Sequence, residues 1–161
     1  MQTFTYPLLS KFIYRYGNIP ASLFLLFILY DSVSNLNASL FNLIPFLITL
    51  LLLYYLNKHY LMLYKIMPSK IEADAGRMTC SKFIFSSKIL TIVYSDIESI
   101  SGGIFEGKSY GLMRVCDGKN KICIGFFNSL TNVRALEKII LAKVNKEIYE
   151  KSAEKIKAMK R

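Results

Sequence analysis

Two long apolar segments occupy the first part of the chain. Residues 19–33 read IPASLFLLFILYDSV, and residues 39–60 read SLFNLIPFLITLLLLYYLNKHY. A helix needs about 20 largely apolar residues to cross a bilayer, with a tolerated range of about 17 to 25. The second segment meets this length. The first is marginal, and its Asp31 lies near the far end, where a carboxylate costs less than at mid-bilayer. The pattern predicts a hairpin of two transmembrane helices, at about 19–34 and 39–63.

A cleaved signal peptide is the alternative for the first apolar segment. No small-x-small cleavage site follows the apolar run before Asp31, and the second segment begins within a few residues. The hairpin therefore explains the pattern better.

The residues before the hairpin also have a helical pattern. Two cations, Lys11 and Arg15, lie between apolar side chains at helical spacing: Leu8, Leu9, Phe12, Ile13 and Tyr16. This predicts an amphipathic helix at the membrane interface, or else a simple extension of the first span.

From about residue 70 the pattern changes to short runs rich in strand-forming residues. These runs are MTCSKFIF (78–85), ILTIVY (89–94), DIESI (96–100), GLMRVC (111–116) and KICIGFF (121–127). Turn signals separate them, among them Asp117-Gly118, which favours a hairpin. The spacing predicts a compact antiparallel sheet or barrel. Within it, residues 94–96 form a tight corner, where we expect Tyr94 to pack with a solvated hydroxyl and Asp96 to accept backbone hydrogen bonds.

The last segment is predicted to be helical. Its apolar residues recur at intervals of three and four: Val133, Leu136, Ile140, Val144 and Ile148. Such a stripe predicts a helix that covers one open face or end of the sheet. Beyond Ile148 the stripe weakens and lysines accumulate, so residues 149–161 are expected to project as a basic helical tail. The predicted domains are thus 1–66, 67–148 and 149–161.

Charge is distributed unevenly along the chain. The 161 residues are 53% hydrophobic, carry a net charge of +10, and have 21 Lys and Arg, of which only Lys11 and Arg15 precede Lys58. This asymmetry indicates a membrane part followed by a water-facing part. Basic residues near a membrane surface attract anionic lipid. The candidate headgroup contacts are Lys11, Arg15, Lys58, Lys65 and Lys70. No nucleic-acid-binding motif accompanies the positive charge.

The same charges predict an orientation in the membrane. The loop between the two apolar segments contains no Lys or Arg, so the positive-inside rule places both termini in the cytoplasm. The odd number of cysteines, Cys80, Cys116 and Cys123, resembles no secreted disulfide framework. Free thiols in a reducing compartment agree with the orientation.

The sequence offers no catalytic constellation. His59 is the single histidine, and Cys116 with Cys123 supplies too few ligands for a structural zinc site. No phosphate-binding glycine motif occurs. We therefore expect no enzyme activity, no metal and no cofactor.

Two stretches carry a resemblance to a known family. Residues 89–100, ILTIVYSDIESI, and the hairpin GLMRVCDGKNKICI (111–124), followed by a helix from Leu130, resemble the membrane-anchored bacterial pleckstrin-homology-like (PH-like) domains. The resemblance implies a seven-stranded barrel closed by a C-terminal helix, hence an α+β fold behind a membrane hairpin. It implies assembly or scaffolding at the membrane and no particular ligand. The stretch KIEADAGRMTCSK lacks the full basic pattern of phosphoinositide-binding relatives, since it holds only Lys70, Arg77 and Lys82.

The sequence thus predicts a non-enzymatic, multi-pass protein of the bacterial inner membrane. Its cytoplasmic PH-like module would serve assembly with a protein partner or with copies of itself, in contact with membrane lipids. The alternative is a small accessory or immunity-type subunit, bound within the bilayer to a larger membrane complex or toxin through Asn42 and Thr49. Neither hypothesis involves nucleic acid or an identified small-molecule substrate.

Overall fold

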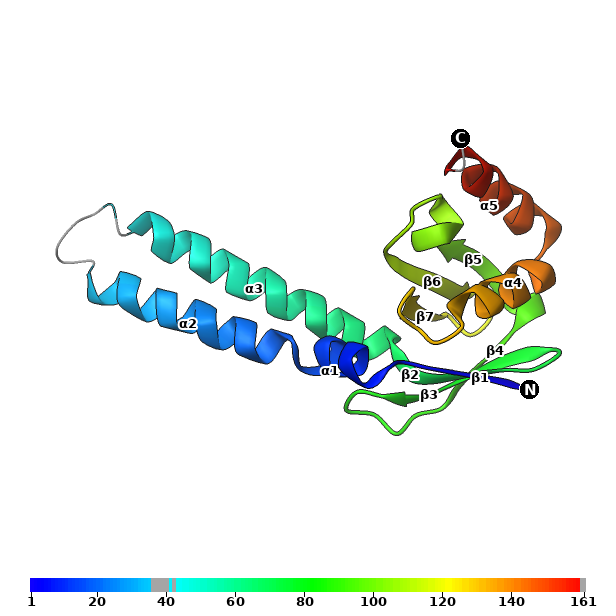
Figure 1. The fold of residues 1–161 in the computed structure, drawn as a ribbon, viewed down its shortest axis with the longest axis horizontal. Coiled ribbons are helices and arrows are strands. Elements are labelled where there is room, and N and C mark those ends of the chain that lie inside the picture. Colours follow the sequence, from blue (N-terminus) through cyan, green and yellow to red (C-terminus); the bar gives the residue numbers. More distant parts are fainter. Residues whose placement is uncertain (36–40, 42, 160–161) are drawn as a thin grey trace. The chain divides into compact units, whose positions relative to one another are not determined.

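The chain folds into two compact units. The computed structural model describes residues 1–35, 41 and 43–159 (Figure 1). One unit is helical and comprises Lys11–Tyr64; the other is rich in strands and comprises Met1–Ser10 with Lys65–Arg161. The β-rich unit therefore takes its first strand from the N-terminus, ahead of the helices.

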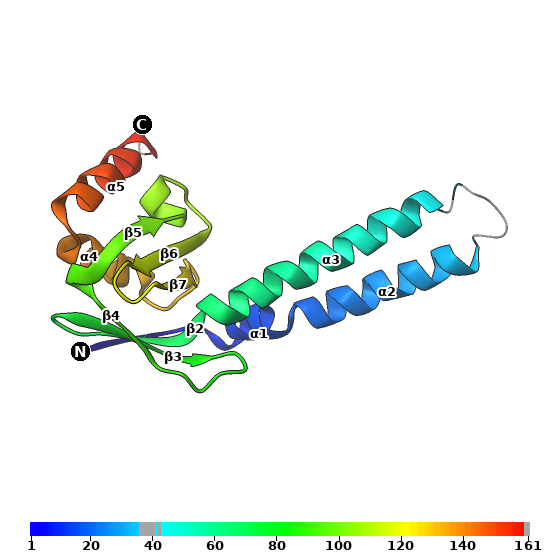
Figure 2. The same cartoon turned by 180° about the vertical axis from the view of Figure 1, so that it is seen from behind.

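The helical unit contains two long helices that lie side by side and run antiparallel (Figures 1 and 2). Helix α1 (Leu8–Tyr16) precedes α2 (Asn18–Ser34), and α3 is Leu43–Ile66. Gly17 lies where α1 meets α2. A Cβ added to it would lie 2.5 Å from both the Ile13 carbonyl oxygen and the Tyr60 hydroxyl, so a glycine permits this close approach.

The prediction of two N-terminal transmembrane helices is wrong for the described residues. Only α3 is long and apolar enough by itself to cross a membrane; α1 and α2 meet the criterion only as a pair, and they are bent by 42°. The cause is local. Helix α2 has 17 residues, and its last turn contains Asp31, Ser32 and Ser34 in place of apolar side chains.

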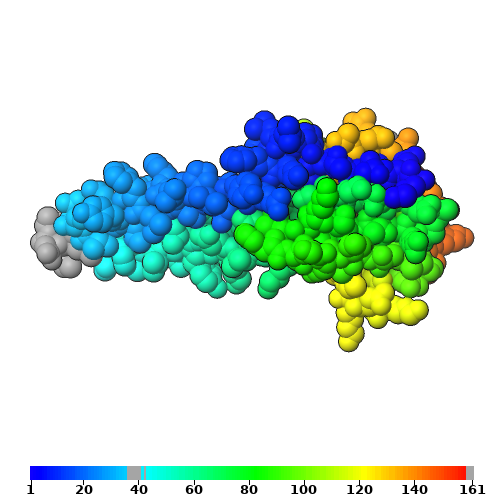
Figure 3. All heavy atoms as spheres, turned by 90° about the horizontal axis from the view of Figure 1, so that it is seen from below, coloured from blue at the N-terminus to red at the C-terminus, as the bar shows by residue number. Residues whose placement is uncertain are grey.

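The β-rich unit contains two antiparallel sheets. The first has the order β1-β2-β3-β4 and the second the order β5-β6-β7. The strands are β1 (Gln2–Thr5), β2 (Pro68–Ala73), β3 (Arg77–Phe83), β4 (Leu90–Val93), β5 (Ile97–Ser101), β6 (Leu112–Asp117) and β7 (Ile122–Phe127). The tip of the β6–β7 hairpin, yellow in Figure 3, stands out from the surface, and its residues 119–121 are exposed.

Alternating apolar side chains of both sheets form the core. The largest side chains with almost no exposed surface are Phe4, Ile71, Met78, Ile92, Phe105, Met113, Val115, Ile124, Phe126, Leu136 and Ile140. Strand β1 is integral to this core, because Phe4 pairs with Ile71 and the Thr5 carbonyl accepts a hydrogen bond from the Thr131 amide at 2.9 Å.

The predicted closed barrel is also wrong, since the described strands form two separate sheets. The 3-10 helix η2 (Tyr94–Asp96) is the physical reason. It redirects the chain between consecutive strands, so that β4 pairs with β3 whereas β5 pairs with β6.

The corner residues differ from expectation. The Tyr94 side chain is buried and its hydroxyl has no hydrogen-bond partner, rather than being solvated. The Asp96 carboxylate accepts a hydrogen bond from the Ser95 hydroxyl at 3.0 Å, while the Asp96 carbonyl, not its side chain, binds the Gly118 amide.

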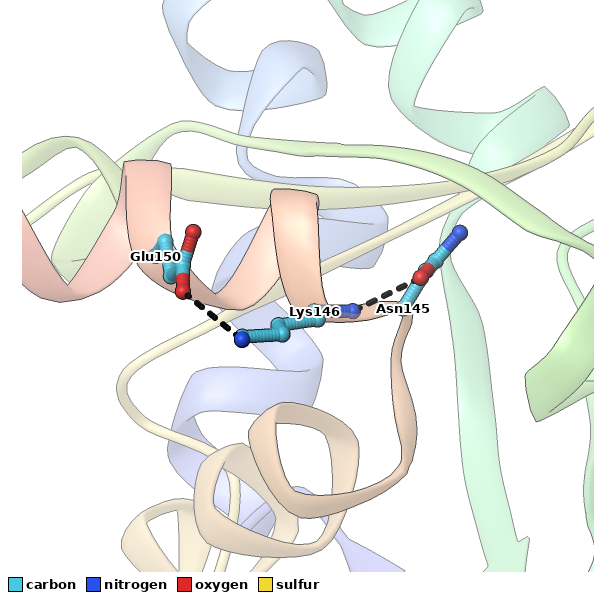
Figure 4. Close-up of polar contacts among 3 residues, drawn as sticks. All are labelled: Asn145, Lys146 and Glu150. Carbon is cyan, nitrogen blue, oxygen red and sulfur yellow. Dashed lines mark hydrogen bonds and ion pairs between the residues drawn. The ribbon is translucent and has the colours of Figure 1, made fainter.

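The single predicted C-terminal helix is two helices, α4 (Val133–Lys143) and α5 (Lys146–Met159). Val144 is extended, and the Asn145 carbonyl accepts the first hydrogen bond of α5, from the Tyr149 amide. Figure 4 shows the start of α5, where the Asn145 side chain accepts a hydrogen bond from the Lys146 amide at 2.8 Å and Lys146 pairs with Glu150 at 3.8 Å. Helix α5 packs on the second sheet, with Ser152 buried, and does not project as a free tail.

Candidate functional surfaces

The helical unit is apolar on its outside, and several polar side chains lie among the apolar ones between its helices. Ser32 of α2 and Thr49 of α3 are 6% and 5% exposed. Large apolar side chains point outward instead, at 45–73% exposure: Leu23, Phe24, Leu26, Phe27 and Tyr30 on α2, and Leu47, Ile48, Leu50, Leu51, Leu52, Tyr54 and Tyr55 on α3. In a water-soluble helical protein the apolar stripe faces the core. Here apolar side chains also cover the outside, and neither α2 nor α3 has a single apolar stripe.

A chain of polar side chains connects α2 with α3. The side-chain amide of Asn18 donates a hydrogen bond to Asn57 Oδ1 at 3.2 Å, and the side-chain amide of Asn57 donates one to Ser22 Oγ at 3.0 Å. The Tyr64 hydroxyl donates to Asn18 Oδ1 at 2.7 Å. We call Asn18, Ser22, Asn57 and Tyr64 the polar seam. Each member is only partly exposed, so the seam replaces hydration with interhelical hydrogen bonds.

The predicted headgroup contacts are divided between the two units. Lys11, Arg15 and Lys58 belong to the helical unit, whereas Lys65 and Lys70 belong to the β-rich unit. The Lys58 ammonium lies 5.5 Å from the centre of the Tyr54 ring. Lys70 is paired with Glu72 at 2.7 Å, so its charge is partly neutralised within the chain.

Of the two residues predicted to contact another helix within the membrane, the structure describes one. Asn42 lies outside the described residues. Thr49 is buried within the helical unit, so its hydroxyl is not exposed to an outside helix.

The cysteines correct the expectation of free thiols. Cys116 and Cys123 face each other in the β6–β7 ladder and form a disulfide. Cys80 is free and buried, and burial raises the pKa of its thiol to about 12. Disulfides persist in oxidising compartments and are rare in reducing ones. The cysteines therefore no longer support a cytoplasmic β-rich unit.

A groove of about 520 Å³ lies between β5 and α5 in the β-rich unit. Its residues come from three elements: Ile97–Ser101 of β5, Phe105 and Glu106 of the 3-10 helix η3 (Gly103–Glu106), and Asn145, Glu147, Ile148, Lys151, Ser152 and Lys155 at and along α5. Figures 1 and 2 both show α5 beside β5. The sequence did not predict this groove, because the pattern alone gives neither the break at Asn145 nor the edge position of β5.

The described residues, those of the groove included, do not form a metal-binding site. Among the residues that the structure describes, no three or more His, Cys, Asp and Glu side chains are arranged to hold a metal ion. The chain was compared with protein-family models, with curated proteins and with solved structures, and none of them matched.

Proposed function

We propose that the chain is a membrane protein without enzyme activity. Its helical unit is embedded in a bilayer through the apolar outer surfaces of α2 and α3, and its β-rich unit, in which β1 and β2 pair on one side of the membrane, binds a protein partner beside it. The exposed apolar side chains on the outside of α2 and α3 are the observation that carries this proposal. Apolar side chains on the outside match lipid tails, and the hydrogen-bonded polar side chains among those between the helices match the packing of helices in membranes.

The charges of the helical unit support the same placement. Lys11, Arg15 and Lys58 flank the apolar stretches at one end, and Asp31 lies near the other end of α2. Cations at the end of a membrane helix contact anionic headgroups, at roughly 1 kcal/mol each near the surface. The Tyr54 and Tyr55 rings near Lys58 suit the interface between lipid and water.

The alternative accessory subunit within the bilayer gains no support. It was motivated by polar side chains open to a foreign helix, and the described one, Thr49, is buried inside its own unit.

Membrane extraction tests the proposal. The full chain is expressed, and membranes are washed with alkaline carbonate and then floated on a density gradient. We expect the chain to float with the lipid after the wash. Recovery in the carbonate supernatant would contradict an embedded helical unit.

A further inference from the structure

The most exposed apolar side chains of the β-rich unit gather at one end of it. We call them the apolar rim, and they are 67–87% exposed: Leu8, Leu9, Phe85, Ile89 and Tyr110. Among the other described side chains of this unit, apart from the N-terminal Met1, no large apolar one is more than 47% exposed. Exposed apolar side chains that gather in one place mark a contact with another protein or with a membrane.

Strand pairing brings four of these residues to the same end. Strands β1 and β3 run antiparallel to β2, so both finish beside its first residues, 68–70. Leu8 and Leu9 follow β1 closely. Phe85 and Ile89 lie in the connection between β3 and β4, which Figures 1 and 2 show at the end of the first sheet where β2 begins.

Tyr110 reaches this end from the second sheet. It lies two residues before Leu112, where β6 begins. A Cβ added to Gly125 would lie 3.0 Å from Leu112 Cδ1 and 3.1 Å from Ile66 Cδ1, so the start of β6 lies beside the residue at which α3 ends. Only Met67 separates α3 from β2. The apolar rim therefore lies around the point where the chain passes from α3 into the β-rich unit.

Phe85 has a backbone conformation that disfavours a bulky side chain. It lies with Ile84 at the tip of a tight turn, in which Phe83 forms a β-bridge with Ser86, and its φ is +58°. Glycine adopts such an angle without steric cost, whereas a side chain there is strained. The Phe85 ring is exposed, so the core gains little from it. A strained residue that packs so little favours a role outside the fold.

The charges beside the apolar rim match an anionic surface. Lys65, Lys82 and Lys88 are exposed at this end, and the connection between β3 and β4 contains no acidic residue. Glu106, which precedes the loop that holds the rim tyrosine, is paired with Lys108 at 3.6 Å. Aromatic and aliphatic side chains with lysines around them are typical of a surface that lies at the boundary of a bilayer.

We propose that the apolar rim inserts into the bilayer that holds the helical unit. Its side chains enter the boundary between headgroups and tails, to a depth of about 5–10 Å. Lys65, Lys82 and Lys88 contact the phosphates of anionic lipids there. Lipid is the occupant because a chain embedded through its helices brings this end of the β-rich unit closest to the bilayer. The proposal rests on the proposed function, and it names the face of the β-rich unit that meets the membrane.

The test uses the full chain in vesicles that contain anionic phosphatidylglycerol and lipids brominated in the upper part of their tails. The chain has no tryptophan, so Phe85→Trp places a single fluorophore in the apolar rim. The control Tyr149→Trp places one at an exposed position of α5 outside it. Relative to vesicles without bromine, the fluorescence of Phe85→Trp should fall about twofold or more. That of Tyr149→Trp should change by less than about one fifth.

Two further variants separate lipid contact from folding. In the Phe85→Trp background, Lys82→Glu/Lys88→Glu should remove at least half of the quenching. Lys119→Glu/Lys121→Glu makes the same change in charge at the tip of the β6–β7 hairpin and should leave the quenching unchanged. Phe85→Gly relieves the backbone strain, so it should resist denaturant at least as well as the wild type. In a Tyr110→Trp background, the same change should nevertheless reduce quenching.

The outcomes distinguish the apolar rim from the embedded helices. Weak quenching of Phe85→Trp with strong quenching of Leu51→Trp, on the outward side of α3, would overturn the rim contact and leave the helical unit embedded. Weak quenching of both would overturn the proposed function as well. Blue-shifted emission of Phe85→Trp without quenching by brominated lipid would show that protein covers the rim, and would overturn lipid as its occupant.

Discussion

Asn18 of α2 and Asn57 of α3 are joined by a side-chain hydrogen bond of 3.2 Å, although 39 residues separate them in the chain. Each of the two amides has a further partner, Tyr64 for Asn18 and Ser22 for Asn57. Because lipid offers no competing hydrogen bonds, such a contact fixes which faces of two helices meet.

The first prediction concerns this pair. A double-mutant cycle of Asn18→Ala and Asn57→Ala should give a coupling energy of about 0.5–1.5 kcal/mol in the stability of the helical unit. The measurement is reversible unfolding in mild detergent. Strictly additive losses would show that the two amides do not interact, and would contradict the polar seam.

The buried Tyr94 hydroxyl gives a second prediction. It has no hydrogen-bond partner, and burial, with the neighbouring Cys80 and Asp74, raises the Tyr94 pKa to about 12. Tyr94→Phe removes this unsatisfied group and keeps the ring, so the free energy of unfolding should be unchanged or should rise by up to about 1 kcal/mol. Denaturant unfolding of the two proteins gives the difference. A loss of more than about 1 kcal/mol would mean that the hydroxyl has a partner.

Asp117 should make the β6–β7 hairpin sensitive to acid. Burial of its carboxyl tends to raise the pKa, but hydrogen bonds from the Asn120 backbone and side chain, at 3.0 and 2.8 Å, and the Lys119 charge outweigh it, so the pKa is lowered. A lowered pKa stabilises the fold above the unfolded-state pKa of about 3.9, and the benefit is lost as pH falls through the folded-state pKa.

The measurement for Asp117 is hydrogen exchange of the hairpin amides in the wild type and in Asp117→Asn. At pH 7 the free energy of opening the hairpin should be about 1 kcal/mol lower in the variant than in the wild type. This difference between the two proteins should become smaller as pH falls below about 3.9. Equal protection of the two proteins at pH 7 would refute a stabilising role for the carboxylate.

The cysteines predict a simple alkylation pattern. Without reductant, iodoacetamide at pH 8 should add no mass to the native chain, because Cys116 and Cys123 are bonded and Cys80 is buried with a thiol pKa of about 12. After mild reduction of the native protein, two additions are expected. Intact-mass spectrometry counts them, and two additions without reductant would exclude the disulfide.

The sequence predicted the helices and strands better than it predicted which strands pair with one another. Helix α3 follows from the length of its apolar run, and most strands of the β-rich unit follow from short runs of strand-forming residues between turn signals. Strand β1 was missed because QTFT is too short for a periodic signal, and its pairing with β2 joins Gln2 to the distant Ala73. The barrel was expected because alternation gives strands but not their partners, and η2 sends β4 and β5 to different sheets.

The candidate surfaces were predictable only in part. Apolar segments with flanking cations indicated the membrane part, but not that Asn18 and Asn57 meet between the helices. The disulfide depends on the register that sets Cys116 opposite Cys123, which the spacing alone did not reveal. The groove was not predictable because it depends on the break between α4 and α5 at Asn145. The apolar stripe continues through Val144 to Ile148 and so indicates one uninterrupted helix.

The most direct test of the central claim uses the absence of tryptophan from the chain. Leu51→Trp introduces one fluorophore on the outward side of α3, and Thr91→Trp introduces one at an exposed position of β4. Both variants are reconstituted in vesicles with lipids brominated along their tails. An embedded helical unit predicts strong quenching of tryptophan fluorescence in the α3 variant and little in the β4 variant. Equal, weak quenching of both would contradict it.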